Sequence, residues 1–126
     1  MEVRNEKRKT DYSEVPDIIS SVSINNYYYL TVIANSRKIG DKEAFAREVI
    51  HMCQENAFHS MKFSTGINGY PSGLDIKIYL VCGDIEKKEA VCNIKFVTDK
   101  YNGESDIKND QDKFHLYLDG NEIEFY

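Results

Sequence analysis

The sequence predicts an α+β domain in which one helix packs on a curved, mostly antiparallel sheet of about five strands. Three observations support this class. One segment carries apolar residues at helical spacing, several segments alternate apolar and polar residues, and two pairs of alternating segments can fold on each other as hairpins. One apolar helix face and several one-sided strands are buried together when the sheet wraps around the helix.

The chain has 126 residues, which suits a single domain with one core. Its net charge of −5 argues against a broad nucleic-acid surface. No apolar run approaches the ~20 residues that span a bilayer. The first residues lack the apolar centre of a signal peptide. This indicates the cytoplasm for the sequence as given, and an extracytoplasmic location if a leader or anchor was trimmed.

Residues 1–20 are expected to form a flexible, charged tail, because basic and acidic residues mix there with little apolar character. Residues 21–126 then form the single α+β domain. Residues 21–34 are rich in β-branched and aromatic side chains, which favours strand. Asn25 and Asn26 tolerate positive φ, so this segment is either one continuous strand or a short hairpin that turns at the two asparagines.

Residues 40–58 contain the one convincing helix, with Asp41 as its N-terminal cap. Placing residues ~100° apart gathers an apolar face for burial in the core. Its members are Phe45, Ala46, Val49, Ile50, Met52 and Cys53. His51 falls on the opposite face from Cys53, so the two cannot bind one metal ion, and the chain has no zinc-binding motif.

Residues 60–65 alternate again and predict a strand after the helix. Residues 66–73 follow, with three glycines and one proline, and predict a loop that joins two strands. The loop lacks the residue order of a phosphate-binding loop. It is a candidate binding loop through Asn68, Tyr70 and Pro71.

Residues 74–82 and 92–98 form the clearest predicted hairpin. Folding it about Lys87 pairs every inward residue with another inward residue, among them Cys82 with Cys92 and Ile78 with Phe96. Two readings of the cysteine pair stay open. They are either reduced thiols packed as small apolar groups, or a cross-strand disulfide that would imply an oxidising compartment.

Residues 98–113 are polar and predict a solvated connection without a calcium-loop pattern. The chain then closes with a second hairpin, turning at Asp119-Gly120. This turn pairs Leu116 with Ile123 on the core face and brings His115 beside Glu124 on the other face. The order of elements is similar to that of cystatin-like folds, in topology only and with no residue carried over. A ferredoxin-like arrangement is the alternative, and it lacks a second convincing helix.

The face of the sheet turned away from the helix is the main candidate site. Tyrosines and lysines alternate on it, and tyrosine offers a large contact area at small entropic cost. The residues expected there are Lys77, Tyr79, Lys95, His115 and Tyr117.

No catalytic set, metal motif or cofactor motif stands out in the sequence. The function expected is therefore a small, non-enzymatic binding domain with a protein partner, with the soluble part of an exported or anchored protein as one setting. The alternative is a ligand-binding or hydrolytic domain with a pocket between helix and sheet. The sequence leaves the oligomeric state open.

Overall fold

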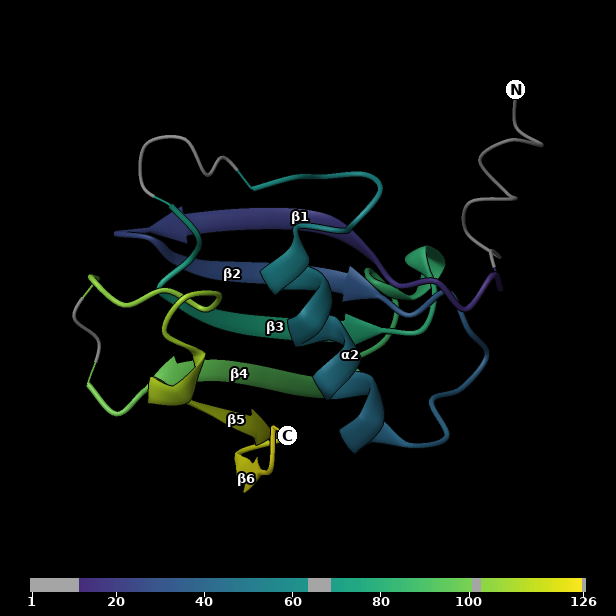
Figure 1. Ribbon diagram of the computed structural model, residues 1–126. Helices are drawn as coiled ribbons and strands as arrows, with labels where there is room; N and C mark the ends of the chain where they lie inside the picture. The colour runs from purple at the N-terminus through teal and green to yellow at the C-terminus, as the bar shows by residue number, and fades with distance from the viewer. Residues whose placement is uncertain (1–11, 64–68, 101–102, 126) are drawn as a thin grey trace.

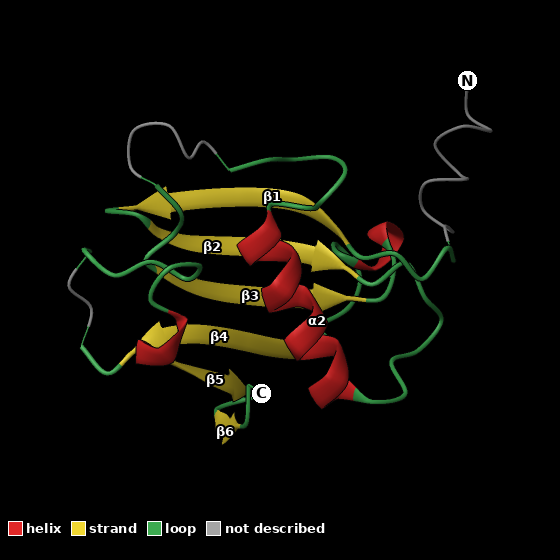
Figure 2. Cartoon of the chain, viewed as in Figure 1, coloured by secondary structure: helices red, strands yellow, loops and turns green. Residues whose placement is uncertain are grey.

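A computed structural model describes residues 12–63, 69–100 and 103–125. These residues contain one α-helix and a six-stranded mixed sheet, so the α+β class is confirmed, with one strand more than expected. The strands lie in the sheet in sequence order, and the helix crosses one face (Figure 1, Figure 2). The elements are β1 (Asp17–Ile24), β2 (Tyr27–Ile33), α2 (Lys42–Glu55), β3 (Gly73–Tyr79), β4 (Cys92–Thr98), β5 (Phe114–Leu118) and β6 (Asn121–Ile123), with 3-10 turns η1 (Cys82–Asp84) and η2 (Gln111–Lys113).

Asn25 and Asn26 form the two-residue turn between β1 and β2. Both have positive φ, 52° and 66°, as a tight hairpin turn requires. Ile24 lies opposite Tyr27, and the two strands pair antiparallel from there. Of the two alternatives for residues 21–34, the hairpin is the one observed.

The tail predicted over residues 1–20 is too long. β1 begins at Asp17, and Ile18 is 1% exposed opposite Val32. Burial of this side chain outweighs the polar composition of the sequence before it, because a fully buried isoleucine contributes about 1.5–3 kcal/mol. Asp17 also accepts a hydrogen bond from the backbone N–H of Ser60, which holds the start of β1 to the segment after the helix.

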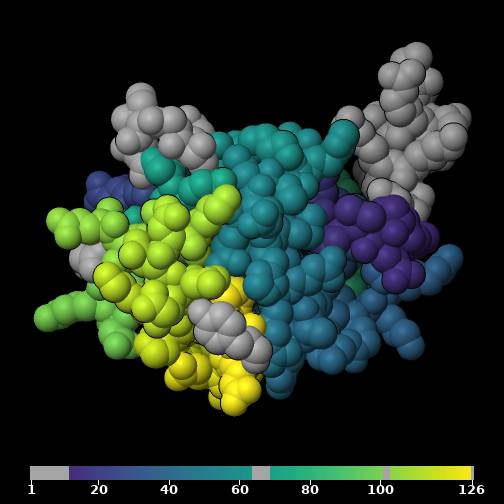
Figure 3. Space-filling view, in the orientation of Figure 1, coloured from purple at the N-terminus to yellow at the C-terminus, as the bar shows by residue number. Residues whose placement is uncertain are grey.

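The helix begins and ends where the sequence predicts. The side chain of Asp41 accepts a hydrogen bond from the N–H of Ala44 at 3.0 Å. Asn56 ends the helix in the left-handed conformation, with φ of 53°. Val49, Ile50 and the other apolar residues of the inner face pack on the sheet. Figure 3 shows the helix side of the molecule covered by α2 and the segments that flank it.

The strand predicted over residues 60–65 does not form in its described part, up to Phe63. There the backbone bonds to a side chain rather than to a strand. The N–H of Phe63 donates to Asn56 Oδ1 at 2.8 Å, and Asn56 Nδ2 donates to the carbonyl of Phe63 at 3.2 Å. The Phe63 ring packs on Tyr28, 5.2 Å between centroids.

The connection from β2 to β3 contains α2, and β3 pairs parallel to β2, as such a helical crossover allows. The other four strand pairings are antiparallel, so the sheet is mixed and mostly antiparallel. The finer predictions, a cystatin-like roll or a ferredoxin-like arrangement, are not confirmed by this topology.

The register predicted for β3 and β4 is wrong by four residues. Cys92 lies opposite Ile78, and Phe96 lies opposite Leu74. A shift by an even number of residues keeps each side chain of the two strands on its predicted face, so the inward residues from Leu74 to Ile78 and from Cys92 to Phe96 are buried as expected. Leu80 and Cys82 were predicted to point inward as well, but the chain leaves the sheet after Tyr79 and both are only partly buried.

The register on which a Cys82–Cys92 disulfide depended is absent, and Cys53, Cys82 and Cys92 are free thiols. Cys53 and Cys92 are buried, whereas Cys82 is partly exposed. Burial raises the pKa of the Cys53 thiol. Burial, and then the nearby Asp119 carboxylate, raise the pKa of Cys92 to about 11. Both buried thiols therefore stay protonated at neutral pH.

The closing hairpin has the register that the sequence predicts. Leu116 lies opposite Ile123, and Asp119 and Gly120 form the turn with φ of 50° and 85°. Beyond β6, Phe125 is buried and its ring lies 4.8 Å from that of Phe96.

The faces of β3 can be tested by a pair of neighbouring variants. Ile78→Ala is expected to lower the free energy of unfolding by about 2–5 kcal/mol, because Ile78 is fully buried and truncation leaves a cavity. Lys77→Ala, on the exposed face, is expected to change it by less than about 0.5 kcal/mol. Urea unfolding measures both, and similar losses would show that the two faces are not assigned correctly.

Candidate functional site

The strand register arranges the uncovered side of the sheet, called the outer face below, into rows of side chains that cross all the strands. One row runs from edge to edge through residues paired in turn: Val22, Tyr29, Asp75, Lys95, Tyr117 and Glu122. The five residues predicted for this side share it: Lys77, Tyr79, Lys95, His115 and Tyr117. The structure therefore brings the predicted set together on one surface.

Apolar side chains gather at one corner of the outer face, on the β1–β2 hairpin. This apolar corner consists of Val22, Ile24, Tyr27 and Tyr29. Three of them are exposed: Val22 by 57%, Ile24 by 59% and Tyr29 by 46%. The rings of Tyr27 and Tyr29 lie 5.1 Å apart. Val22 and Ile24 were not among the predicted site residues, because only the hairpin register places them beside the two tyrosines.

Tyr27 is fixed in the corner by the backbone of β3. It lies opposite Gly73, where an added Cβ would stand 2.6 Å from its ring, so only glycine leaves room for this packing. Burial first, then the charge of Asp75 and the neighbouring Tyr29, raise the pKa of Tyr27 to about 12. The phenol therefore stays neutral, and the corner carries no charge of its own.

The charges next to the corner neutralise one another. Lys95 Nζ lies 4.0 Å from Asp75 Oδ2 in an ion pair. The other Asp75 oxygen accepts a hydrogen bond of 2.8 Å from Asn93 Nδ2. The middle of the outer face is therefore polar without being strongly basic, which differs from the electropositive surface that phosphate groups require.

The sequence predicted His115 beside Glu124. In the structure, His115 lies between two other carboxylates. Its Nδ1 lies 2.7 Å from Glu122 Oε2, and its Nε2 lies 2.9 Å from Asp99 Oδ1. The hydrogen bond to Glu122 is the largest cause that raises the pKa of His115, with a further contribution from Asp99. Glu124 instead accepts a bond at its backbone carbonyl from Arg47 Nε.

The stability of the fold is expected to depend on His115 titration. Because its pKa is raised in the folded state, the imidazolium contributes stability fully below its ordinary pKa of about 6.5 and loses it as pH rises through the higher folded value. His115→Gln should remove this dependence. Urea unfolding between about pH 6 and pH 9 at low salt measures it, and parallel curves for both proteins would contradict the role given to the imidazolium.

The candidate loop is integrated into the fold where the structure describes it. Asn68 lies outside the described residues. Tyr70 and Pro71 lie inside, and Pro71 is buried. The carbonyl of Tyr70 accepts a bond from Asn26 Nδ2 at 3.0 Å, and that of Pro71 accepts one from the N–H of Ile107 at 3.0 Å.

The connection after β4 was predicted to be solvated, but part of it is buried. Ile107 is fully buried, and its carbonyl accepts a hydrogen bond of 2.8 Å from Gln54 Nε2 on the helix. One apolar residue and one helix amide therefore anchor this polar segment over the sheet.

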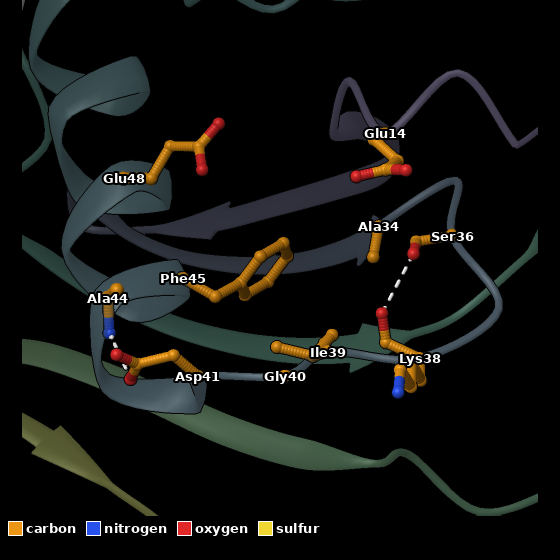
Figure 4. Close-up of a pocket in the computed structure, with 10 residues that line it drawn as sticks. All are labelled: Glu14, Ala34, Ser36, Lys38, Ile39, Gly40, Asp41, Ala44, Phe45 and Glu48. Atoms are coloured by element: carbon orange, nitrogen blue, oxygen red, sulfur yellow. Dashed lines mark hydrogen bonds between the residues drawn. The ribbon is translucent and has the colours of Figure 1, made fainter.

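A hollow of about 220 Å³ lies between the first turns of α2 and the end of β2 (Figure 4). Phe45 points across it from the helix, while Glu14 and Glu48 stand on opposite sides. Asp41 already caps the helix through Ala44. The hollow is smaller than the roughly 300–1,000 Å³ of most ligand sites.

A larger groove of about 860 Å³ lies near the same end of the sheet. Its lining is about equally polar and apolar: Asp17, Ile18, Ile19, Ile33, Asn35, His59, Ser60, Met61 and Cys82. Asn35 is 5% exposed, and its Nδ2 donates to the carbonyl of Val15 at 2.8 Å. Its Oδ1 is buried and has no hydrogen-bond partner among the residues that the structure describes.

Within the described ranges, no three His, Cys, Asp or Glu side chains converge as metal ligands. The same ranges contain no helix with the length and apolar character to cross a membrane. No protein-family model, curated protein or solved structure matches this chain.

Proposed function

We propose that this chain is a non-enzymatic, protein-binding domain that contacts its partner through the outer face of the sheet. The apolar corner is the observation that carries the proposal. Large apolar side chains left this exposed and grouped at one place are typical of interaction surfaces. Single exposed apolar residues, in contrast, are common and need no explanation.

The composition around the corner supports a protein partner. Tyrosine side chains bury a large area while only two torsion angles become fixed. The Asp75–Lys95 pair and the flanking polar residues would form the hydrated rim that surrounds an interface core. Nucleic acid is a weaker partner, because Asp75 and Glu122 share the face with Lys77 and Lys95 in a chain of net charge −5.

Site-specific photo-crosslinking tests the proposal in a lysate of the native host. Benzoylphenylalanine replaces Tyr29 in one protein and Tyr12 in the control. The two tyrosines are similarly exposed, 46% and 41%, but Tyr12 precedes β1 and lies off the outer face, against Arg37. A defined adduct is expected from position 29 and not from position 12.

The adduct then provides the partner for a direct binding measurement. Ile24→Lys is expected to weaken binding tenfold or more, which is about 1.4 kcal/mol or above, with the unfolding free energy nearly unchanged because Ile24 is exposed. Equal adducts from both positions, or unchanged affinity in Ile24→Lys, would refute the proposal.

A second candidate function is small-ligand binding in the larger groove, favoured by the unpaired Oδ1 of Asn35. A buried acceptor without a donor costs about 1–3 kcal/mol, so a ligand that supplies an N–H recovers this energy. The ligand would reach the oxygen by displacing the side chains that cover it.

Indole and benzothiophene test this second candidate, because they have nearly the same shape and only indole has an N–H. Indole is expected to shift the NMR signals of the Asn35 amide and the Met61 methyl, and benzothiophene to shift them much less. Equal shifts, or none with indole, would exclude the groove as a donor-selective site.

A further inference from the structure

β1 forms one edge of the sheet, and half of it is open. Its start is held by the bond from Ser60 to Asp17, and the register shifts between Ile18 and Ser20. From Ser20 to Ile24 the backbone has no hydrogen bonds, within the described residues, beyond those of its ladder with β2. Four of these five residues are exposed, and Ser21 is partly exposed.

The hairpin turn determines which backbone groups face outward. In a two-residue hairpin the residues that flank the turn, here Ile24 and Tyr27, exchange hydrogen bonds, and hydrogen-bonded pairs then alternate with non-bonded ones. Val22 therefore bonds to Tyr29. Ser21 and Ser23 direct their N–H and C=O groups away from β2, to the open edge.

Natural sheets protect such edges with charges, prolines, bulges or short strands. In β1 the charge of Asp17 and the register shift lie at the start of the strand, and Ser20–Ile24 has neither. The sequence from Ile18 to Asn26 is free of charged residues and proline. The opposite edge differs, because β6 has three residues and includes Glu122. An edge without charge can face its own copy without repulsion, whereas β1 against β6 would leave most of β1 unpaired.

We infer that two copies of this chain pair antiparallel through Ser20–Ile24 and form one continuous sheet with a two-fold axis at Val22. Each Ser21 then faces Ser23 of the second copy, and the pair exchanges both backbone hydrogen bonds. Val22 faces its own counterpart as a non-hydrogen-bonded pair, in which side chains approach most closely. Such a contact is isologous and closes at two copies.

The pairing joins the two apolar corners into one surface. The two Val22 side chains, 57% exposed in one copy, contact each other at the centre, and Ile24 lies diagonal to Val22 of the second copy, with Tyr29 beside Val22 on each copy. The inference shares this corner with the proposed function but does not depend on it. Tyr29 and the polar part of the outer face stay accessible to a further protein.

Sedimentation velocity over a range of concentrations tests the pairing with two matched variants of the full chain. Val22 and Val15 are equally exposed, 57% and 56%, but Val15 precedes β1. Val22→Lys is expected to raise the dissociation constant tenfold or more, because two ammonium groups would meet at the axis. Val15→Lys is expected to leave it unchanged, and circular dichroism checks that both variants fold.

Amide hydrogen exchange on the unaltered chain gives a second readout. The amides of Ser21 and Ser23 are expected to exchange slowly at high concentration and fast on dilution, while the amide of Val22 stays protected by β2 at both. A monomer at all concentrations, a dimer equally stable in Val22→Lys, or fast exchange at Ser21 and Ser23 within the dimer would overturn the inference. A monomer with a Tyr29 adduct to another protein refutes only the dimer, and a dimer without one refutes only the proposed function.

Discussion

Burial of α2 against one face of the sheet is the interaction on which the rest of this structure depends. Within the described residues there is one α-helix for six strands, so one face of the sheet is covered and the other meets water. Val49, Ile50 and Cys53 of the helix are fully buried in the same cluster as Ile76 and the other inward residues of the strands. The period of two then places every second strand residue on the uncovered face.

The outer face therefore follows from the fold, and its chemistry varies along it. Over β3 to β6 the exposed positions carry charges, as in Lys77 and Lys95, and partners for those charges. Over β1 and β2 they carry valine, isoleucine and tyrosine instead. A solvated face needs only polar residues, so this change of composition within one sheet is the feature on which the proposed protein partner rests.

Alternation predicted the faces of the strands better than it predicted their partners. Leu80 and Cys82 continue the alternating pattern of β3 after the chain has left the sheet, which is why the predicted pairing of β3 with β4 is wrong by four residues. The bond from the N–H of Val91 to the carbonyl of Ile78 determines the actual register. No local pattern reveals it, whereas Asp119-Gly120 predicts its turn directly and Asn25-Asn26 allowed a turn as one of two alternatives.

The sequence also predicted which face carries the candidate site, but not all of its residues. Lys77, Tyr79 and their neighbours share the outer face because parity alone places them there. The apolar corner was not predictable from β1 by itself, since Val22 and Ile24 read equally well as core residues.

Residues 60–63 were predicted to form a strand and do not. They alternate like a strand, yet a side-chain amide from Asn56 satisfies the backbone that a neighbouring strand would otherwise bond. Long-range partners decide such cases, and a single sequence does not record them.

The three thiols lie at different depths, so their alkylation rates can report local opening of the unaltered chain. Cys82 is partly exposed in η1, Cys92 is buried at the start of β4, and Cys53 is fully buried in the core. Alkylation requires a thiolate in contact with the reagent, so each rate reports the opening that exposes that sulfur. The rate at Cys82 serves as the surface reference. The rate at Cys92 reports opening at the start of β4, and the rate at Cys53 reports separation of the helix from the sheet. Three rates on one unaltered protein would therefore show whether this domain opens in stages or as one cooperative unit.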